Sequence, residues 1–163
     1  LFAAGLVLAL VSSLHARDDE PVQSDELFAT FEFELAEWTE RYEAADGMRA
    51  RRTLRAEHPA AAFEARFEVL AAAGDLRARL WTIEYLDNMN LRSRAREARR
   101  LTNYQALVKD FPGQEAALPG LEALLADRRL RRSEGIKTVR AFVNEAIAGF
   151  QEEEQCCLHR LRE

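Results

Sequence analysis

Four side chains near the carboxyl end of the chain are the clearest candidates for chemistry. They recur at spacings of four, three and four: Glu152, Cys156, His159 and Glu163. On a helix these spacings place the four groups on one face, and carboxylate, thiolate and imidazole groups all bind zinc. No C-x-x-C or H-x-x-x-H pair elsewhere in the chain supplies further ligands. We therefore treat them as candidate metal ligands and expect no bound metal or other cofactor.

Cys156 and Cys157 are the only cysteines in the chain. Neighbouring positions on a helix point in different directions, so the two thiols cannot form an unstrained bridge there. In an oxidising compartment an exposed thiol would pair with a second chain. Alternatively, one thiol packs as a small apolar group beside Leu158 and Leu161. The chain lacks the C-x-x-C motif of thiol–disulfide exchange, and the redox state of the pair stays open.

Motifs of nucleophilic, phosphate-binding and metalloprotease chemistry are absent: the chain has no G-x-S-x-G, no glycine-rich phosphate loop and no H-E-x-x-H. His15 lies in an apolar amino-terminal segment, which leaves His58 and His159 as candidate bases. His58 precedes Pro59, and the residue before a proline is a frequent helix boundary. With no evident catalytic partner nearby, we expect His58 to cap a helix or to face solvent. The sequence indicates no catalytic residue and favours a non-enzymatic role.

The elements that would carry these residues are all expected to be helices. Ala, Leu, Glu and Arg dominate the composition, and they are strong helix formers. Only four prolines and seven glycines interrupt the chain, so the helices should be long and the turns short. With 163 residues, 48% of them apolar and 31% charged, the chain suits one globular domain. We expect an all-α fold of about six or seven helices.

The stretch Leu101–Leu125 predicts a helical hairpin around which the rest of the chain is organised. Apolar residues recur at helical spacing up to Phe111 and resume at Ala117. Between them, Pro112 cannot continue a helix, and Gly113 readily takes the positive φ of a sharp reversal. Antiparallel hairpins of this kind are the units that stack in α-solenoids.

An earlier stretch repeats this pattern at an offset of 38 residues, from Val69 to Leu107. Two helical segments, Ala60–Ala73 and Leu76–Met89, flank a turn at Gly74-Asp75. Apolar positions of the two stretches align in pairs: Phe63 with Leu101, Val69 with Leu107, Leu70 with Val108, Leu80 with Leu118, Ile83 with Leu121 and Leu86 with Leu124. The segment 136–150 could begin a third unit. This period lies between those of tetratricopeptide and HEAT repeats, so we expect about two or three stacked hairpins.

The clearest helical period lies ahead of these hairpins and follows Ser24, which suits an N-cap. Five residues recur there at spacings of three and four: Phe28, Phe31, Leu35, Trp38 and Tyr42. Such a stripe could stack on a ligand, but its commoner role is to dock on neighbouring helices, and we expect a core face. The helix should end near Ala45. A short arginine-rich helix should follow over Met48–Glu57.

Arginines cluster in Leu91–Arg100 and again around Leu130–Glu134, although the net charge of the chain is -5. That net charge argues against a nucleic-acid partner. Neighbouring arginines point around a helix rather than along one face, so we expect solvated surface that pairs with the acidic first helix. The expected partners are Glu32, Glu34, Glu37, Glu40 and Glu43. The alternative is a patch that binds phosphate or an acidic polymer.

Residues 1–16 resemble the apolar core and cleavage region of a secretory signal peptide. The apolar run is shorter than the about 20 residues of a membrane-spanning helix, although an uncleaved anchor or a buried helix would also fit. We expect an exported protein of the periplasm or cell envelope, which contacts a membrane only if this segment is uncleaved. Residues 17–23 then form a short linker. Residues 24–163 form a single helical domain that could be cut short at its carboxyl end.

Two short motifs carry a resemblance to a known family. They are His58-Pro59-Ala60 ahead of Phe63 and Arg66-Phe67, and Tyr104 followed by Phe111-Pro112-Gly113. The stretch from His58 to Leu125 resembles the tetratricopeptide-like helical regions of secreted bacterial proteins. Some of those regions precede a thioredoxin-like domain. The resemblance implies stacked helical hairpins and assigns no functional residue.

These patterns favour a non-enzymatic protein–protein interaction or scaffolding module, which presents a helical groove to a protein or peptide partner. The binding residues, the partner and the oligomeric state are not identified by the sequence. The alternative hypothesis is the amino-terminal helical accessory region of a longer thioredoxin-like redox protein. A third hypothesis is arginine-mediated binding of an acidic polymer.

Overall fold

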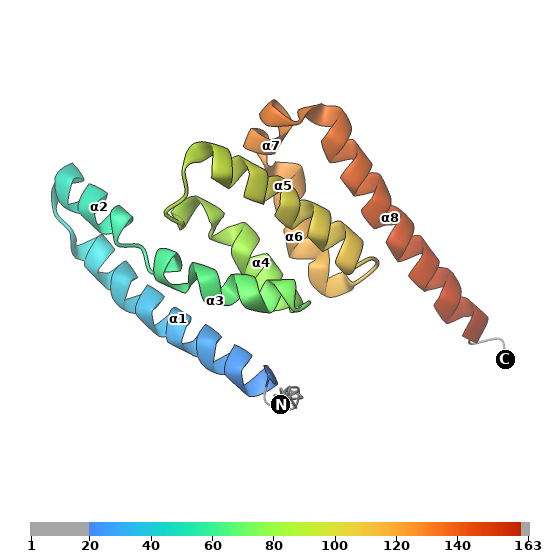
Figure 1. The fold of residues 1–163 in the computed structure, drawn as a ribbon, viewed down its shortest axis with the longest axis horizontal. Helices are drawn as coiled ribbons and strands as arrows, with labels where there is room; N and C mark the ends of the chain where they lie inside the picture. The colour runs from blue at the N-terminus through green and yellow to red at the C-terminus, as the bar shows by residue number, and fades with distance from the viewer. Residues whose placement is uncertain (1–19, 161–163) are drawn as a thin grey trace, which may run out of the picture.

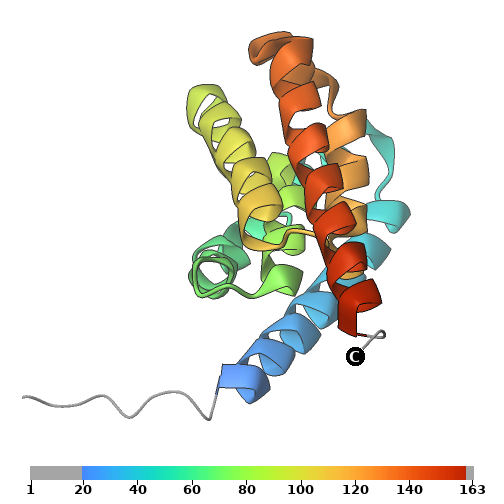
Figure 2. The same cartoon turned by 90° about the vertical axis from the view of Figure 1, so that its right-hand side faces the viewer.

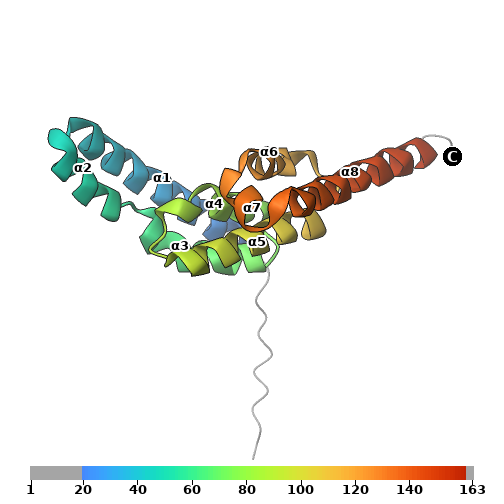
Figure 3. The ribbon, with the colours of Figure 1, turned by 90° about the horizontal axis from the view of Figure 1, so that it is seen from above.

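The computed structural model describes the backbone of residues 20–160 and the side chains of residues 24–132, 134–135 and 137–151. This part of the chain is all-α, as expected. It forms eight α-helices: α1 (Glu20–Ala44), α2 (Gly47–Ala56), α3 (Ala60–Ala72), α4 (Leu76–Glu84), α5 (Ser93–Asp110), α6 (Leu118–Ala126), α7 (Arg128–Ser133) and α8 (Gly135–Arg160). Short 3-10 helices follow α4 and precede α6. In Figure 1 and Figure 3, α1 and α2 extend at one end, α8 extends at the other, and α3–α6 lie between them.

Helix α1 begins at Glu20, so Ser24 lies inside the helix and the prediction of Ser24 as its N-cap is wrong. Residues 20–23 of the expected linker likewise belong to α1. A glutamate and a proline both suit a first helical turn, because the N–H groups of that turn have no intrahelical acceptor. The Ser24 hydroxyl instead donates to Asp75 Oδ2 at 2.9 Å. This bond ties α1 to the turn between α3 and α4.

The aromatic stripe of α1 forms a core face, as its spacing predicted, and Phe31 lies at the centre of it. The Phe31 side chain is 2% exposed. Its ring meets four others edge to face: Phe63 (5.4 Å between centroids), Phe67 (5.8 Å), Trp81 (5.1 Å) and Tyr85 (4.9 Å). Such pairs add about 0.5–1.5 kcal/mol each to the burial of the rings. The cluster therefore joins α1 to both helices of the first hairpin.

Helices α3 and α4 form that first hairpin, and its turn lies at the predicted Gly74-Asp75. Gly74 has a φ of +95°, which a residue with a side chain rarely adopts. Asp75 then caps α4, since its Oδ1 accepts the N–H of Ala78 at 2.9 Å. The turn is therefore specified by two adjacent residues with distinct roles.

Helices α5 and α6 form the second hairpin, and Gly113 reverses the chain after α5 with a φ of +71°. Helix α6 approaches α5 and α4 closely because Gly120 has no side chain. A Cβ on Gly120 would lie 2.5 Å from Leu107 Cδ2 and 2.7 Å from Leu80 Cδ2. Helix α8 lies across α5 and α6 (Figure 2) and covers the second hairpin.

The offset of 38 residues aligns the turns of the two hairpins but not all of their buried positions. Val69 on α3 is 69% exposed, whereas Leu107 on α5 is 0% exposed. The reason is the difference in neighbours, since α5 packs against α4, α6, α7 and α8, while Val69 borders an open groove. The alignment of Val69 with a buried leucine is therefore wrong.

The arginines of α5 pair with acidic groups of the central helices rather than with α1. Arg99 contacts Glu64 and Glu68 of α3. The ion pairs that α1 makes with another helix come from outside the arginine clusters: Arg77 of α4 lies 3.4 Å from Glu32 Oε1. The expectation that the clusters neutralise the first helix is wrong for the α5 arginines, because α3 and α4 lie between α5 and α1 (Figure 1).

Arg100 joins α5 to the segments on either side of it. Its side chain is 6% exposed, with Nη2 donating to Asp87 Oδ1 at 2.8 Å and Nε to Asp127 Oδ2 at 2.9 Å. Asp127 also caps α7, since its Oδ1 accepts the N–H of Leu130 at 2.9 Å. Burial, and then the neighbouring Asp127 carboxylate, raise the pKa of Tyr104 well above its usual range. A buried guanidinium thus holds two chain turns in place.

Replacing Arg100 by methionine keeps the bulk of the side chain but leaves Asp127 without its buried cation. We expect Arg100→Met to lower the free energy of unfolding by roughly 2–4 kcal/mol, measured by urea denaturation. Arg94→Met is the matched control, because Arg94 is exposed and makes no ion pair with any described side chain. The control should stay within about 0.5 kcal/mol of the unmodified protein. Equal effects of the two substitutions would contradict the role of Arg100.

Candidate functional site

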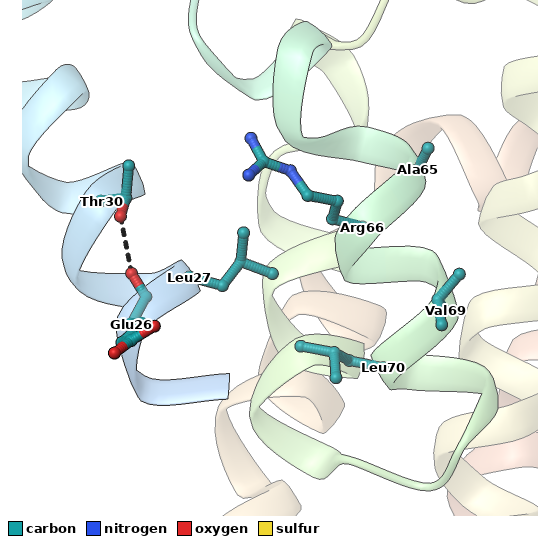
Figure 4. Close-up of a pocket in the computed structure, with 7 residues that line it drawn as sticks. All are labelled: Glu26, Leu27, Thr30, Ala65, Arg66, Val69 and Leu70. Atoms are coloured by element: carbon teal, nitrogen blue, oxygen red, sulfur yellow. Dashed lines mark hydrogen bonds between the residues drawn. The ribbon is translucent and has the colours of Figure 1, made fainter. Parts of the chain in front are cut away.

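An open groove runs between α1 and α3, and we call it the α1–α3 groove. Its first part has a volume of about 540 Å³ and is shown in Figure 4. That part is lined by Glu26, Leu27, Thr30, Ala65, Arg66, Val69 and Leu70. The second part, about 580 Å³, is lined by α1 from Thr30 to Arg41 and by the α2–α3 connection and first turn of α3, from Ala56 to Ala62. Both parts include Thr30, and their lining positions recur at helical spacing, so they follow one side of the helix pair.

Aromatic side chains on the adjoining face of the same helices create this groove. Phe28 and Phe31 of α1 meet Phe67 and Phe63 of α3 at centroid distances of 4.7 and 5.4 Å. Side chains of this size hold two helix axes about 10 Å apart. Beside these aromatic positions, the helix surfaces carry Thr30 on α1 and alanines on α3. These side chains are too short to fill the space between the two helices.

The first part of the groove is floored by aliphatic side chains. Leu27 extends from α1 into the space beside α3, and Leu70 points toward it from α3 (Figure 4). Val69 borders the same space with 69% of its surface exposed. The Arg66 guanidinium lies 4.4 Å from the centroid of the Phe63 ring, and Glu26 supplies the opposite charge. This part offers an apolar contact surface with no net charge.

The second part of the groove is acidic. Phe33 is 65% exposed there and lies beside Glu34 and Glu37. Neither glutamate makes an ion pair with a side chain that the structure describes. The nearby Arg41 Nη1 is instead 3.9 Å from Glu57 Oε2. An exposed aromatic ring therefore lies next to carboxylates that have no cation of their own.

His58 closes the floor of the second part. Its side chain is 6% exposed, so the expectation that it faces solvent is wrong, whereas the alternative expectation of a cap is confirmed. Nδ1 accepts the N–H of Ala60 at 3.2 Å at the start of α3. The ring packs 4.5 Å from the Trp38 ring, and burial lowers the pKa of His58. One ring nitrogen of His58 is therefore committed to the backbone at the start of α3, and the ring packs beside Trp38.

Four arginines of α2 line a separate site of about 470 Å³ together with Met48 and Tyr42: Arg49, Arg51, Arg52 and Arg55. No residue of α2 is buried, and Arg55 Nε donates to the Tyr42 hydroxyl at 3.0 Å. These guanidinium groups therefore form a basic surface on an exposed helix.

The candidate metal ligands lie outside the described side chains. Glu152, Cys156 and His159 belong to the backbone of α8, and Glu163 lies beyond the described residues altogether. The same holds for the side chain of Cys157. Among the side chains that are described, no group of three or more His, Cys, Asp and Glu residues could hold a metal ion.

Comparison with known proteins identifies no relative: no family model, curated protein or solved structure matches this chain. The function must therefore be argued from the geometry of the chain itself. Between residues 20 and 160, no helix is both long enough and apolar enough to cross a membrane.

Sequence reasoning missed the residues that line the groove. Phe33 lies off the aromatic stripe of α1, and Val69 was assigned to a buried position. The signal that could have found them is a large apolar residue outside the core face of its helix. Two such residues, Val69 in the first part of the groove and Phe33 in the second, would have marked the site.

The burial of His58 generates a pH prediction. Because burial lowers its pKa in the folded protein, the unfolded chain takes up a proton first as the pH falls. The contribution of His58 to the free energy of unfolding is complete above the ordinary pKa of about 6.5, and decreases as the pH falls from there through the folded pKa. His58→Asn retains an acceptor for the Ala60 N–H but cannot titrate. Urea denaturation at about pH 7.5 and about pH 5.5 should show a smaller loss of stability in the variant than in the unmodified protein. Identical losses would contradict this role.

Proposed function

We propose that this chain is a non-enzymatic binding module whose α1–α3 groove takes up a segment of a protein or peptide partner. The observation that carries the proposal is the groove itself, in which two connected parts of about 540 and 580 Å³ expose Phe33 and Val69. Large apolar side chains left in a rimmed groove are typical of interaction sites.

The architecture supports the same role. In our proposal the two hairpins, α3–α4 and α5–α6, are stacked units of a tetratricopeptide-like array, with α1 and α2 added ahead of them. Arrays of this kind present extended surfaces to their partners. We further propose that the protein acts after export, in the periplasm or cell envelope, on the basis of the signal-peptide-like residues 1–16.

The size of the groove suits a short segment rather than a folded domain. Burying one aliphatic or aromatic anchor contributes about 1.5–3 kcal/mol. Two or three anchors contribute about 3–9 kcal/mol in total, from which the cost of ordering the segment is subtracted. The expected Kd is therefore weaker than 1 μM, which corresponds to about -8 kcal/mol, and lies between about 10 μM and about 1 mM. Affinity of this order is typical of reversible recruitment.

Selection of binding peptides tests the proposal directly. A display library of random peptides of about 15 residues would be selected on the full chain, and the Kd of each selected peptide measured by fluorescence anisotropy. We expect peptides with a Kd between about 10 μM and about 1 mM that bind Val69→Asp at least about tenfold more weakly, because an aspartate removes an apolar contact and must be desolvated. Val69 is 69% exposed, so the variant should fold normally.

Leu125→Asp is the matched control, since Leu125 is 53% exposed on α6 and lies outside the groove. Peptide affinity should be unchanged in this variant. If the selection returns no binding peptide, or if the two variants weaken binding equally, the groove is not the binding site.

A further inference from the structure

The two parts of the α1–α3 groove differ in charge, and this difference indicates what the groove binds. The inference rests on the proposed function. We infer that the occupant is a basic amphipathic helix, which places an apolar anchor against Leu27, Val69 and Leu70 and a lysine or arginine beside Glu34 and Glu37.

The charge of the groove is set by carboxylates that the protein leaves unpaired. Helix α1 carries seven acidic residues from Asp25 to Glu43. Among the described side chains, the cations of neighbouring helices reach Asp25 and Glu32 alone, through Arg77. Glu34 and Glu37 have no ion-pair partner among the described side chains, and Arg41 faces Glu57 at 3.9 Å. A cationic segment would supply the missing partners. An acidic segment would meet like charges.

The first part of the groove does not favour a cation. There the lining holds one carboxylate, Glu26, and one guanidinium, that of Arg66, which lies over the Phe63 ring at 4.4 Å, so the two charges sum to zero. The exposed lining is aliphatic, from Leu27, Val69 and Leu70. An apolar side chain of the occupant therefore belongs at this part, and the positive charge belongs at the other.

The shape of the groove suits a helix. Its wall on α1 runs from Glu26 to Arg41 along one face, which is about 22 Å at 1.5 Å per residue. A helix laid beside α1 and α3 would fill the space that the aromatic rings hold open, and its apolar stripe would meet both walls. The described residues 20–160 contain no β-strand, so they offer an extended segment no sheet edge to pair with at the groove.

The positions on α1 also set the register of the occupant. Leu27 and the pair Glu34 and Glu37 are seven to ten residues apart, or about 10–15 Å along the helix axis. An occupant helix lying along α1 should therefore carry its cation about two to three turns from its apolar anchor. This spacing distinguishes the inference from general attraction between opposite charges.

Two synthetic helical peptides of about 18 residues test the inference. Both carry the same leucine stripe, and one carries lysines where the other carries glutamates. Fluorescence anisotropy with the full chain should show the lysine peptide binding at least about tenfold more tightly, with a difference that shrinks between about 50 mM and about 300 mM salt. The double substitution Glu34→Gln and Glu37→Gln should weaken the lysine peptide about three- to tenfold.

The matched control is Glu40→Gln with Glu43→Gln, which removes the same charge from α1 outside the groove lining. It should leave the affinity within about twofold. Reversing the groove charges with Glu34→Lys and Glu37→Lys should make the glutamate peptide the tighter ligand. Moving the lysines to one turn from the anchor should also weaken binding.

Equal binding of the two peptides, or equal effects of the groove and control substitutions, would overturn the inference. These results would leave the proposed function intact if peptides from the random library still bind the Val69→Asp variant more weakly than the unmodified protein. A proline in the middle of the lysine peptide should abolish binding, and unchanged binding would mean an extended occupant. Sedimentation would show whether the chain self-associates. Self-association that the Val69→Asp substitution removes would mean that a second copy of the chain fills the groove, and this result would also overturn the inference.

Discussion

The burial of Phe31 among the rings of α3 and α4 is the interaction on which the rest of the structure depends. It is the point at which α1 meets both helices of the first hairpin, with the Phe31 side chain 2% exposed. The same rings that stabilise the contact also set the separation of α1 and α3. The α1–α3 groove is therefore a consequence of core packing, because large side chains on one face hold apart the small side chains on the next.

The two ends of the molecule are stabilised by different kinds of interaction, aromatic packing at one and a buried ion-pair network at the other. Around α1, α3 and α4 the contacts are mainly aromatic, and no helix within residues 20–160 covers the exposed side of α1 and α3. Around α5, α7 and the turn after α4, a 6%-exposed Arg100 binds Asp87 and Asp127, and α8 covers the hairpin. The half that contains α5–α8 is ion-paired and covered, and it can hold the half with the open groove in place. Binding surfaces are commonly positioned by a rigid scaffold of this kind.

The sequence predicted the all-α class, both turns and the core stripe of α1, because each depends on local chemistry. Gly74 and Gly113 reverse the chain through a conformation that favours glycine, and Pro112 stops a helix wherever it occurs. The sequence did not predict the start of α1 correctly, because a glutamate and a proline suit a first helical turn at residues 20–21 while Ser24 suits an N-cap. The Ser24 hydroxyl bonds instead to Asp75, which is distant in the sequence. The exposure of Val69 was not predicted, because the spacing of apolar residues identifies one face of a helix but does not show whether another helix covers that face. Whether the α1–α3 groove is open depends on which helices cover α1 and α3, so the groove could not be predicted from the sequence.

We propose the α1–α3 groove as the binding surface of this protein. The most direct test is an amide chemical-shift titration of the isotope-labelled full chain with a peptide selected on it. The account predicts that the shifted amides lie along the groove, around Thr30 and Phe33 on α1 and around Val69 on α3, while those of α5 and α6 stay in place. Shifts confined to α5–α8, or spread evenly over the molecule, would contradict it.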